Sequence, residues 1–454
     1  MSKSIKLRKG LDIRLIGEAK TTKSKLPLPK SVSIKPSDFH SMTPKMVVKE
    51  GGKVNAGSTL FYDKYNESIK YASPISGTVK AIVRGAKRRI LEVVVESDGQ
   101  QSYEESTIGK LSDMSADQVK EIILSSGLWP MINQRPIDVV ADPKNSPKSI
   151  FVSAFSSAPL APDYNFLLQG MEEEFQTGLD ALKMLTSGKV HLTLDAKSTS
   201  ADMFKNAKGV QINTISGKHP AGNVGTQIHH IDPINKGEFV WTVNAQDVAI
   251  IGRYFLTGKF DTTKTIALTG SEISEPQYFE TIIGACVSDL LDGKIKTDNV
   301  RVISGNVLTG DKIDQDGYLG FYHNEVTVIP EGDQMKFVAT EGWMAPGFKR
   351  FSNSRTFPTW ILPKSKKFRL DTNTNGEERA FVVTGELEKV FPFDIFPMQL
   401  VKAAITDDID GMENLGIYEV APEDFALCEY VCTSKINIQD EIRQGLDLIA
   451  SECM

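Results

Sequence analysis

Short apolar runs separated by turn residues dominate residues 36–100. The runs are Met46–Val48, Val54, Leu60–Tyr62, Ile69–Tyr71, Thr78–Val83 and Ile90–Val95. Runs of this length, bounded by Gly, Ser and Asp, are typical of β-strands in a small all-β domain. Ahead of them, Ile5–Ile16 is predicted as a short strand, followed by irregular chain rich in Lys and Pro. We predict one barrel-like domain over residues 1–105.

The pattern changes at Ser115, where helices begin to alternate with strands. Ala116–Ser125 is amphipathic, and Ser115 with Gln118 three residues later predicts a capping box at its start. The elements that follow are a strand (Ser149–Ala154), a helix (Phe166–Leu185), a strand (Lys189–Leu194), a short helix (Ala201–Ala207), a strand (Gly209–Thr214) and a helix (Asn244–Thr257). Alternation at this spacing favours a parallel sheet with helices on its faces. We predict a Rossmann-like α/β domain over residues 106–258.

A compact unit with one helix across a small sheet is predicted for residues 259–340. Its elements are the strands Thr265–Leu268, Tyr278–Ile283 and Val300–Ser304, the helix Val287–Leu291, and the further strands Glu325–Ile329 and Lys336–Ala339. This order suggests a β-grasp (SLBB-like) domain. Residues 341–454 are predicted to hold a linker and a C-terminal helical domain, with helices at Met398–Ile405, Met412–Leu415, Pro422–Val431 and Asp440–Ala450. The whole chain is thus predicted to be an α/β multidomain protein.

The length of the chain indicates several domains, and its charge distribution suggests surfaces for binding partners. The 454 residues exceed the size of about 250–300 at which single cores stop growing. Residues 1–53 carry 13 Lys and Arg against 4 Asp and Glu, whereas residues 371–454 carry 5 against 18. A basic head and an acidic tail suggest surfaces for partners or phosphates, although such charge is often only solvation. In the linker, Arg350 and Arg355 lie among aromatic residues and fit either an anionic partner or plain packing.

Neither a membrane span nor a disulfide framework is expected. No apolar run approaches the roughly 18–20 residues that cross a bilayer, and no secretory signal follows the basic N-terminus. The four cysteines in so long a chain fit a reducing compartment. If the protein works at a membrane, we expect other chains to hold it there.

The most distinctive stretch is Lys218–Pro233, KHPAGNVGTQIHHIDP. It contains three of the six histidines, His219, His229 and His230, and the glycines Gly222 and Gly225. Glycines allow a close approach to another group or a positive φ. The stretch follows a predicted strand, and ligands in open α/β sheets bind outside the carboxyl ends of strands. Two interpretations stay open: a tight connection with partly buried histidines, or a ligand-facing loop.

Motifs for bound nucleotides, metals and nucleophiles are missing from the sequence. There is no G-x-G-x-x-G or G-x-x-x-x-G-K-[ST] loop to hold phosphates, and no G-x-S-x-G elbow. Cys428 and Cys432 supply two thiolates, whereas a four-iron cluster needs four. On a strand, His229 and His230 would point to opposite faces, which makes them poor joint ligands. We predict a chain without its own nucleotide or metal site.

The first domain resembles the biotinyl/lipoyl hammerhead through E-G-G-K-V-x-A-G and S-P-I-S-G-T-V. In modified members of that family, a lysine stands eight residues before the proline of the second motif. That position here is Asn66, and neither Lys64 nor Lys70 takes the place. We therefore expect this domain to be structural and not a swinging-arm carrier.

Motifs along nearly the whole chain resemble the A subunits of the sodium-translocating NADH:quinone oxidoreductases, the bacterial respiratory sodium pumps. They are I-K-L-R-K-G-L-D at Ile5–Asp12, S-P-I-S-G-T-V at Ser73–Val79, S-G-L-W-P at Ser126–Pro130, R-P at Arg135–Pro136, H-P-A-G-N-V-G-T-Q-I-H-H-I-D-P at His219–Pro233, G-W-M-A-P-G-F at Gly342–Phe348 and A-L-C-E-Y-V-C at Ala426–Cys432. The layout is also similar to the flavoprotein component of respiratory complex I and to the C component of the Rnf complex. Where those relatives hold flavin and NADH in a G-x-G-G-A-G-F-P loop, this chain has Ser125–Pro130, with one glycine and the bulky Trp129.

The resemblance implies a peripheral subunit on the cytoplasmic face of the inner membrane, held by the other subunits of the complex. It implies quinone binding, with quinone reduction to quinol coupled to Na⁺ export, and activity only within the complex. No FMN, FAD, NAD or Fe–S cluster is expected in this subunit, and no nucleic acid is expected as a partner. A quinone needs flat apolar walls and a few donors, for which the candidates are Trp129, Arg135, His229, His230, Gly222 and Gly225. The alternative is a cofactor-free scaffold that only organises the complex.

Overall fold

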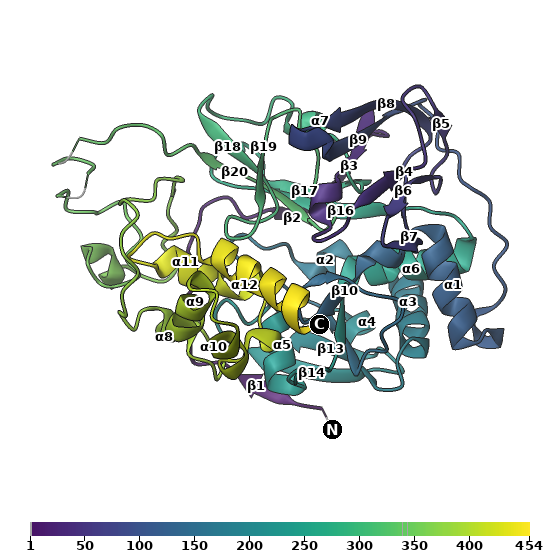
Figure 1. Ribbon diagram of the computed structural model, residues 1–454. Coiled ribbons are helices and arrows are strands. Elements are labelled where there is room, and N and C mark those ends of the chain that lie inside the picture. Colours follow the sequence, from purple (N-terminus) through teal and green to yellow (C-terminus); the bar gives the residue numbers. More distant parts are fainter. Residues whose placement is uncertain (1, 338, 343) are drawn as a thin grey trace.

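The computed structural model describes residues 2–337, 339–342 and 344–454, and this part of the chain contains four β-sheets (Figure 1). None of its helices combines the length and the apolar character that a bilayer crossing requires. The mixed α/β, multidomain layout predicted from the sequence is confirmed.

Two small sheets form the N-terminal sandwich. One sheet has the strand order β3-β9-β8-β5, with bounds Ser31–Ile34, Ile90–Ser97, Gly77–Arg84 and Lys53–Val54. The other has the order β4-β6-β7, with bounds Pro44–Met46, Thr59–Asp63 and Asn66–Ala72. Side chains such as Val32, Phe61 and Val95 alternate inward and are fully buried. The strands predicted from the short apolar runs are confirmed.

A seven-stranded sheet forms the centre of the α/β region, in the order β1-β14-β13-β12-β15-β10-β11. The bounds in that order are Ser4–Lys6, Gln211–Ser216, Lys189–Asp195, Ser149–Ser153, Val240–Asn244, Ile132–Arg135 and Val139–Val140. The strands β14, β13, β12 and β15 are parallel, as the alternation of helices and strands predicted, while β10 is antiparallel to β15. The sheet therefore has a carboxyl edge at which the loops after several strands meet.

Helices cover both faces of this sheet (Figure 1). On one face, Ile150 and Val152 share a core with α1 (Ala116–Ser126), α3 (Glu172–Met184) and α6 (Ala245–Thr257). On the other face, Phe151 packs with Ile228 and Ile231 of α5 (Val224–Ile231). The alternation of side chains along β12 thus decides which helix each residue meets. Short helices α2 (Tyr164–Leu167) and α4 (Asp202–Lys205) complete the region.

A six-stranded sheet has the order β19-β18-β20-β16-β17-β2. The bounds in that order are Asp311–Ile313, Val300–Ser304, Glu325–Pro330, Thr263–Thr269, Gln277–Ile282 and Lys20–Lys25. Helix α7 (Ser288–Leu291) packs on it through Leu290 and Leu291. Strands β1 and β2 both come from the first 25 residues, so the start of the chain pairs with two sheets outside the sandwich.

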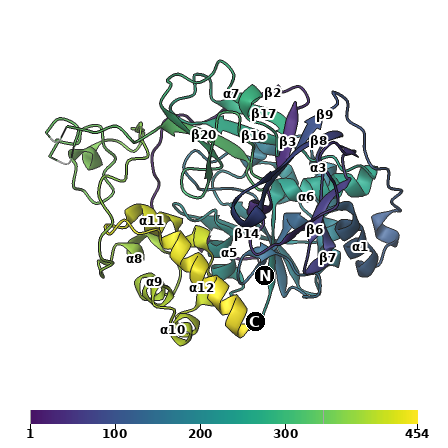
Figure 2. The ribbon, with the colours of Figure 1, turned by 45° about the horizontal axis from the view of Figure 1, so that its top comes forward.

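The C-terminal residues form a helical group beside the α/β sheet (Figures 1 and 2). Its helices are α8 (Leu387–Val390), α9 (Pro397–Ile405), α10 (Ile409–Asn414), α11 (Ala426–Val431) and α12 (Ile438–Cys453), with the 3₁₀ helices η6 (Ile417–Glu419) and η7 (Pro422–Phe425). Cys428 and Cys432 are buried in its core. Between β20 and α8, the described residues contain only the 3₁₀ helix η5 (Pro358–Ile361). The other 3₁₀ helices are η1 (Pro36–Asp38), η2 (Ala86–Arg88), η3 (Leu111–Asp113) and η4 (Trp129–Met131).

Several predicted elements are wrong. The strand expected over Ile5–Ile16 is limited to β1, while the Lys-rich chain expected to be irregular contains β2, an exposed edge strand. The helix expected over Phe166–Leu185 is interrupted between α2 and α3, where Gly170 has φ +85°. The strand expected over Lys336–Ala339 includes residue 338, which lies outside the described residues.

The largest error concerns Lys218–Pro233, whose second half is helix α5 and not a loop. Its glycines and flanking prolines suggested a turn, but Ile228 and Ile231 bury against Phe151 of the sheet. This tertiary packing outweighs the weak helix propensity of the glycines.

Candidate functional site

The turn before α5 closes the carboxyl edge of the α/β sheet. His219 is buried, and its Nδ1 lies 3.1 Å from the hydroxyl of Ser157 in the loop after β12. The N–H of Gly222 donates to the same hydroxyl at 2.7 Å. A Cβ on Gly222 would lie 2.4 Å from the Ser157 nitrogen, so the close approach requires glycine. Burial lowers the pKa of His219 to about 4, which leaves its imidazole neutral.

Arg135, at the end of β10, is buried among three carboxylates. Its terminal nitrogens Nη1 and Nη2 donate to Asp424 Oδ2 at 2.8 Å and to Glu423 Oε1 at 2.5 Å, while Nε lies 3.6 Å from Asp138 Oδ1. Burial by itself lowers the pKa of Arg135, but the three negative charges outweigh it and raise that pKa. Gly225 of α5 packs against Asp424, since a Cβ there would lie 2.4 Å from the carboxylate oxygens. The guanidinium therefore serves as an internal counter-charge between β10, α5 and η7.

His229 joins α5 to the C-terminal helices through both ring nitrogens. Its Nε2 accepts the N–H of Asp394 at 3.0 Å, so the ring proton lies on Nδ1, which donates to Glu419 Oε2 at 2.8 Å. Its ring centre lies 4.8 Å from that of Phe393. The half-buried His230 donates from Nδ1 to the Thr226 carbonyl of its own helix at 2.9 Å.

Trp129 lies in the core, away from these residues. Its indole N–H donates to the Ala141 carbonyl at 2.7 Å, and its ring meets Trp241 edge-on at 5.4 Å. Just before it, Gly127 has φ +82°, and a Cβ there would lie 2.6 Å from the Cβ of Ala72 in β7. The stretch Ser125–Pro130 is therefore the contact between helix α1 and the sandwich.

Arg135, Gly225, Asp424 and His229 thus meet where α5 docks on the C-terminal helices, and we call this region the α5 junction. Gly222 lies at its edge and Trp129 lies elsewhere. Arg135, His229 and Trp129 bond within the protein. Among the described residues, Arg135 Nε and Asp424 Oδ1 are buried without a hydrogen-bond partner.

A cleft of about 650 Å³ opens between the N-terminal sandwich and the six-stranded sheet. Its lining includes Lys35, Asp38, Tyr318, Phe321, Tyr322 and His323, and none of the six residues predicted from the sequence. A volume of this size is in the range of pockets that bind small molecules. Aromatic rings from the sheet side and charged groups from both sides make it the candidate functional site.

Asp38 and His323 are the carboxyl and imidazole groups of the cleft with shifted pKa values, and burial also raises the pKa values of Tyr318 and Tyr322. Burial raises the pKa of Asp38 to about 6, although nearby Lys35 and the Phe321 N–H, which donates to Asp38 Oδ2 at 2.9 Å, favour the ionised form. Burial lowers the pKa of His323 to about 4. Its Nδ1 lies 2.8 Å from the Ser304 hydroxyl, which also accepts the Gly320 N–H. Near neutral pH the imidazole is uncharged, while Asp38 exchanges its proton readily.

The aromatic wall of the cleft is held rigidly. The Tyr322 hydroxyl donates to the Pro130 carbonyl at 2.7 Å, and the ring of Phe321 meets Phe39 edge-on at 4.9 Å. On the other side, Lys35 donates to the Tyr318 carbonyl at 3.1 Å. The arrangement can therefore hold a flat ring with polar edges, donate hydrogen bonds to its oxygens, and exchange a proton with it.

The residues that line the cleft were not among the site residues predicted from the sequence. The stretch Gly317–Asn324, GYLGFYHN, packs three aromatic residues and a histidine into eight positions with two glycines, and this density was the available signal. Its partner residues 35–38 lie in a different predicted domain. As to metals, no group of three or more His, Cys, Asp and Glu side chains suited to an ion occurs in the part of the chain that the structure describes.

Three family models match this chain. They are described as the NqrA N-terminal barrel-sandwich hybrid domain (residues 5–98), the NqrA second alpha/beta domain (residues 114–260) and the NQRA C-terminal domain, which matches residues 265–315. A relative from Rhodopirellula baltica is 38% identical over 454 residues and covers 98% of both chains. Relatives from Neisseria meningitidis serogroup B and Pseudomonas aeruginosa are 37% identical over 99% of this chain and 100% of theirs. Each of the three is named as the A subunit of the Na(+)-translocating NADH-quinone reductase.

Among solved structures, an NAD+-reducing [NiFe]-hydrogenase in the H2-reduced state matches with a TM-score of 0.34 and 13% identity, over 51% of this chain and 52% of that one. This likeness is too weak to bear on fold or activity.

Proposed function

This chain belongs to the NqrA family, the A subunits of the Na(+)-translocating NADH-quinone reductases, and from that premise we propose that it holds the quinone head group in the cleft. In this proposal the chain is a peripheral subunit, attached through partner subunits on the cytoplasmic face of the inner membrane. Quinone reduction to quinol there is coupled by the whole complex to Na⁺ export.

The observation that carries the proposal is the pairing of aromatic walls with an ammonium and a proton-exchanging carboxyl in one cleft. A quinone is a flat ring with two carbonyl oxygens. Lys35 is placed to donate a hydrogen bond to one of them, and the rings of Tyr318 and Phe321 supply flat walls. Quinol formation takes up two electrons and two protons, and a carboxyl with a pKa of about 6 suits proton transfer near neutral pH.

The electrons come, in this proposal, from reduced cofactors in partner subunits. In the relatives named above for their layout, flavin lies in a glycine-rich loop that matches Ser125–Pro130 here. That stretch packs against the sandwich through Gly127 and Ala72, which supports a chain that contributes binding and proton transfer without a flavin at this position.

A calorimetric titration of the purified chain with a short-tailed soluble quinone tests the proposal. We expect saturable binding of one quinone per chain, weakened about tenfold or more by Lys35→Met, because a hydrogen bond to a charged group contributes about 1.5–3 kcal/mol. Tyr318→Leu, which removes part of the wall, should weaken it as well. Lys49→Met is the matched control, since Lys49 is exposed and does not line the cleft.

A second candidate function is a scaffold that only organises the complex. The engagement of Arg135 and His229 in internal bonds favours it, because the sequence motif that marks the family then serves packing. No saturable quinone binding, or equal affinities for Lys35→Met and Lys49→Met, would leave the scaffold as the better account.

A further inference from the structure

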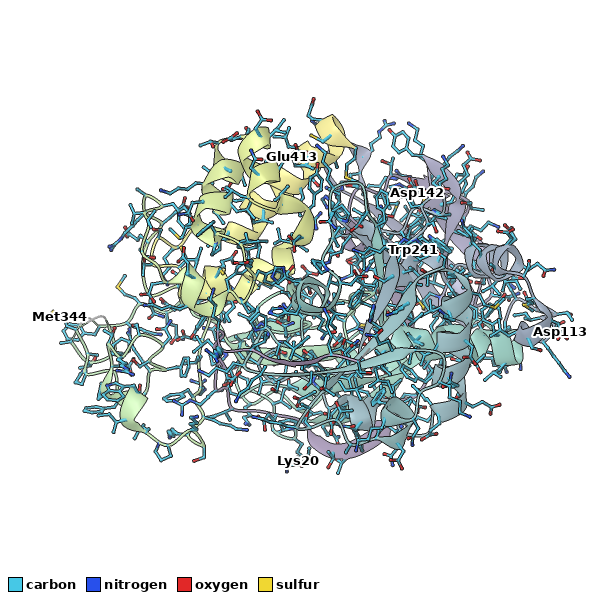
Figure 3. The ribbon with its side chains drawn as sticks, turned by 90° about the horizontal axis from the view of Figure 1, so that it is seen from below. Lys20, Asp113, Asp142, Trp241, Met344 and Glu413 are labelled. Atoms are coloured by element: carbon cyan, nitrogen blue, oxygen red, sulfur yellow. The ribbon has the colours of Figure 1, made fainter. Side chains whose placement is uncertain are left out.

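The described residues between 335 and 367, which we call the basic lobe, extend away from the body of the molecule. Figures 1 and 2 show this segment outside both the six-stranded sheet and the C-terminal helices, and Figure 3 shows Met344 at the far edge of the molecule. The described residues of this connection contain no regular secondary structure besides η5, and a connection of this length is uncommon in a compact domain and usually has a function.

The lobe exposes apolar side chains that a water-soluble surface rarely shows together. Phe337, Phe348 and Ile361 are each about 70% exposed, and Met335 is completely exposed. Further large apolar side chains exposed within the same segment are Met344, Trp360 and Leu362. Exposed apolar residues gathered in one segment mark a surface for a protein or a membrane.

The charge of the lobe is opposite to that of the rest of the chain. The segment carries seven Lys and Arg against one Glu, a net charge of +6, while the whole chain has a net charge of −6. The remainder therefore carries −12. Lys349, Lys364 and Lys366 are exposed and have no ion pair with any described residue. An anionic surface would attract this segment.

Internal contacts give the lobe a defined shape. Arg350 donates to the Glu341 and Gly342 carbonyls at 2.6 and 3.0 Å, and Thr359 donates to the Arg350 carbonyl at 2.6 Å. The guanidinium of Arg355 lies 5.2 Å from the ring centre of Trp360. These contacts hold aromatic and basic groups next to one another on the same body.

We propose that the basic lobe binds the anionic surface of a phospholipid bilayer. Lysine is depleted in protein–protein interfaces, whereas each Lys or Arg beside an anionic membrane strengthens binding, and Trp and Phe side chains settle at the level of the headgroups. The irregular backbone of the lobe stays at that level, where water satisfies its polar groups. The proposal rests on the lobe alone and is independent of quinone binding.

Sedimentation of the purified full chain with vesicles tests this proposal. We expect binding to phosphatidylcholine vesicles that contain phosphatidylglycerol, little binding to pure phosphatidylcholine, and weaker binding as salt is added. The triple variant Lys349→Gln, Lys364→Gln, Lys366→Gln should weaken the partition on the order of 100-fold at low salt, at roughly fivefold for each charge lost. The double variant Phe337→Ser, Phe348→Ser should weaken vesicle binding by a factor that does not change with salt concentration.

The matched control is Lys110→Gln, Lys205→Gln, Lys208→Gln, which removes the same charge from exposed lysines outside the lobe. Equal vesicle binding by the two triple variants would overturn the proposal, as would no binding of the unmodified chain to anionic vesicles. If the lobe variant binds vesicles normally but fails to assemble with the other subunits in detergent, the lobe is a protein-docking surface and the bilayer proposal is wrong.

Discussion

In the α5 junction, Arg135 is bonded to Asp424 and Glu423, and both nitrogens of His229 have partners. In the cleft, Asp38 and His323 face a cavity of about 650 Å³ and have pKa values shifted toward their neutral forms. The two regions use the same kinds of side chain, but the junction groups face one another in the packed interior, whereas the cleft groups line an open cavity. The conspicuous sequence motif lies at the junction, while the cleft is marked in the sequence only by the aromatic density of Gly317–Asn324.

The largest expected effect comes from breaking the charge cluster of the junction. Arg135→Met leaves Asp424 buried without its counter-charge, and such a loss costs about 3–5 kcal/mol. Urea unfolding, followed by tryptophan fluorescence, should show the earliest unfolding transition at a lower urea concentration, with a loss in free energy of unfolding of that size. Arg355→Met, at an exposed position, is the control. Equal unfolding curves for the two variants would mean that the junction does not hold the domains together.

Adding one methyl group at the junction should have the next largest effect. Gly225→Ala places a Cβ 2.4 Å from the Asp424 carboxylate oxygens, and overpacking of this kind costs about 1–3 kcal/mol. Gly109→Ala is the matched control, because its Cβ would meet only the Met114 side chain, at 3.7 Å. Thermal unfolding of both variants measures the difference. A Gly225→Ala protein as stable as the control would contradict the close packing of α5 against η7.

A smaller effect concerns a buried carboxyl of the six-stranded sheet. Glu325 lies at the start of β20, where its Oε2 has no hydrogen-bond partner among the described residues, and burial raises its pKa from 4.5 to about 8. The folded chain thus keeps this proton in a range where the unfolded chain loses it, so the free energy of unfolding should fall as pH rises toward 8. Glu325→Gln should flatten that dependence by at least about 1 kcal/mol, since one pKa unit corresponds to about 1.4 kcal/mol.

Between pH 6.5 and 8 Glu325 titrates together with Glu423, whose pKa burial raises to about 7, so only the difference between the unmodified chain and Glu325→Gln reports on Glu325. His323, with a pKa lowered to about 4 from 6.5, makes stability rise with pH only below 6.5, and Asp38 has lost its proton above about 6. Urea unfolding across that window compares the unmodified chain with Glu325→Gln. Identical slopes would show that Glu325 is ionised in the folded chain.

The smallest effect is expected at His230. Its ring is half-buried and donates a hydrogen bond to the Thr226 carbonyl of its own helix, so His230→Ala should change stability by less than about 1 kcal/mol. Quinone affinity measured by calorimetry should be unchanged. A clear loss of affinity in this variant would return the quinone site to the junction.

Much of the fold follows from local sequence patterns. The strands of the sandwich and the cap of α1, in which Ser115 accepts the Gln118 N–H, were predictable because each depends on neighbouring residues. Helix α5 and strand β2 were not. Helix α5 depends on the contact of Ile228 with Phe151 of β12. Strand β2 is a polar edge strand, and its own residues give no signal of its pairing with β17.

The residues of the cleft could not be predicted from local sequence patterns for a related reason. Residues 35–38 and 311–323 line the same cleft, although nearly the length of the first three predicted domains separates them in sequence. Burial in the folded chain raises the pKa of Asp38, and its neighbours in sequence do not reveal that burial. The sequence motifs indicated the right family, and the six site residues predicted from them lie outside the cleft.

Hydrogen–deuterium exchange of the purified chain with and without a soluble quinone compares the two regions in one measurement. On quinone binding we expect slower exchange in residues 31–40 and 311–324, which border the cleft, and no change in residues 219–233. Protection confined to residues 219–233 would contradict this expectation and place the quinone at the α5 junction.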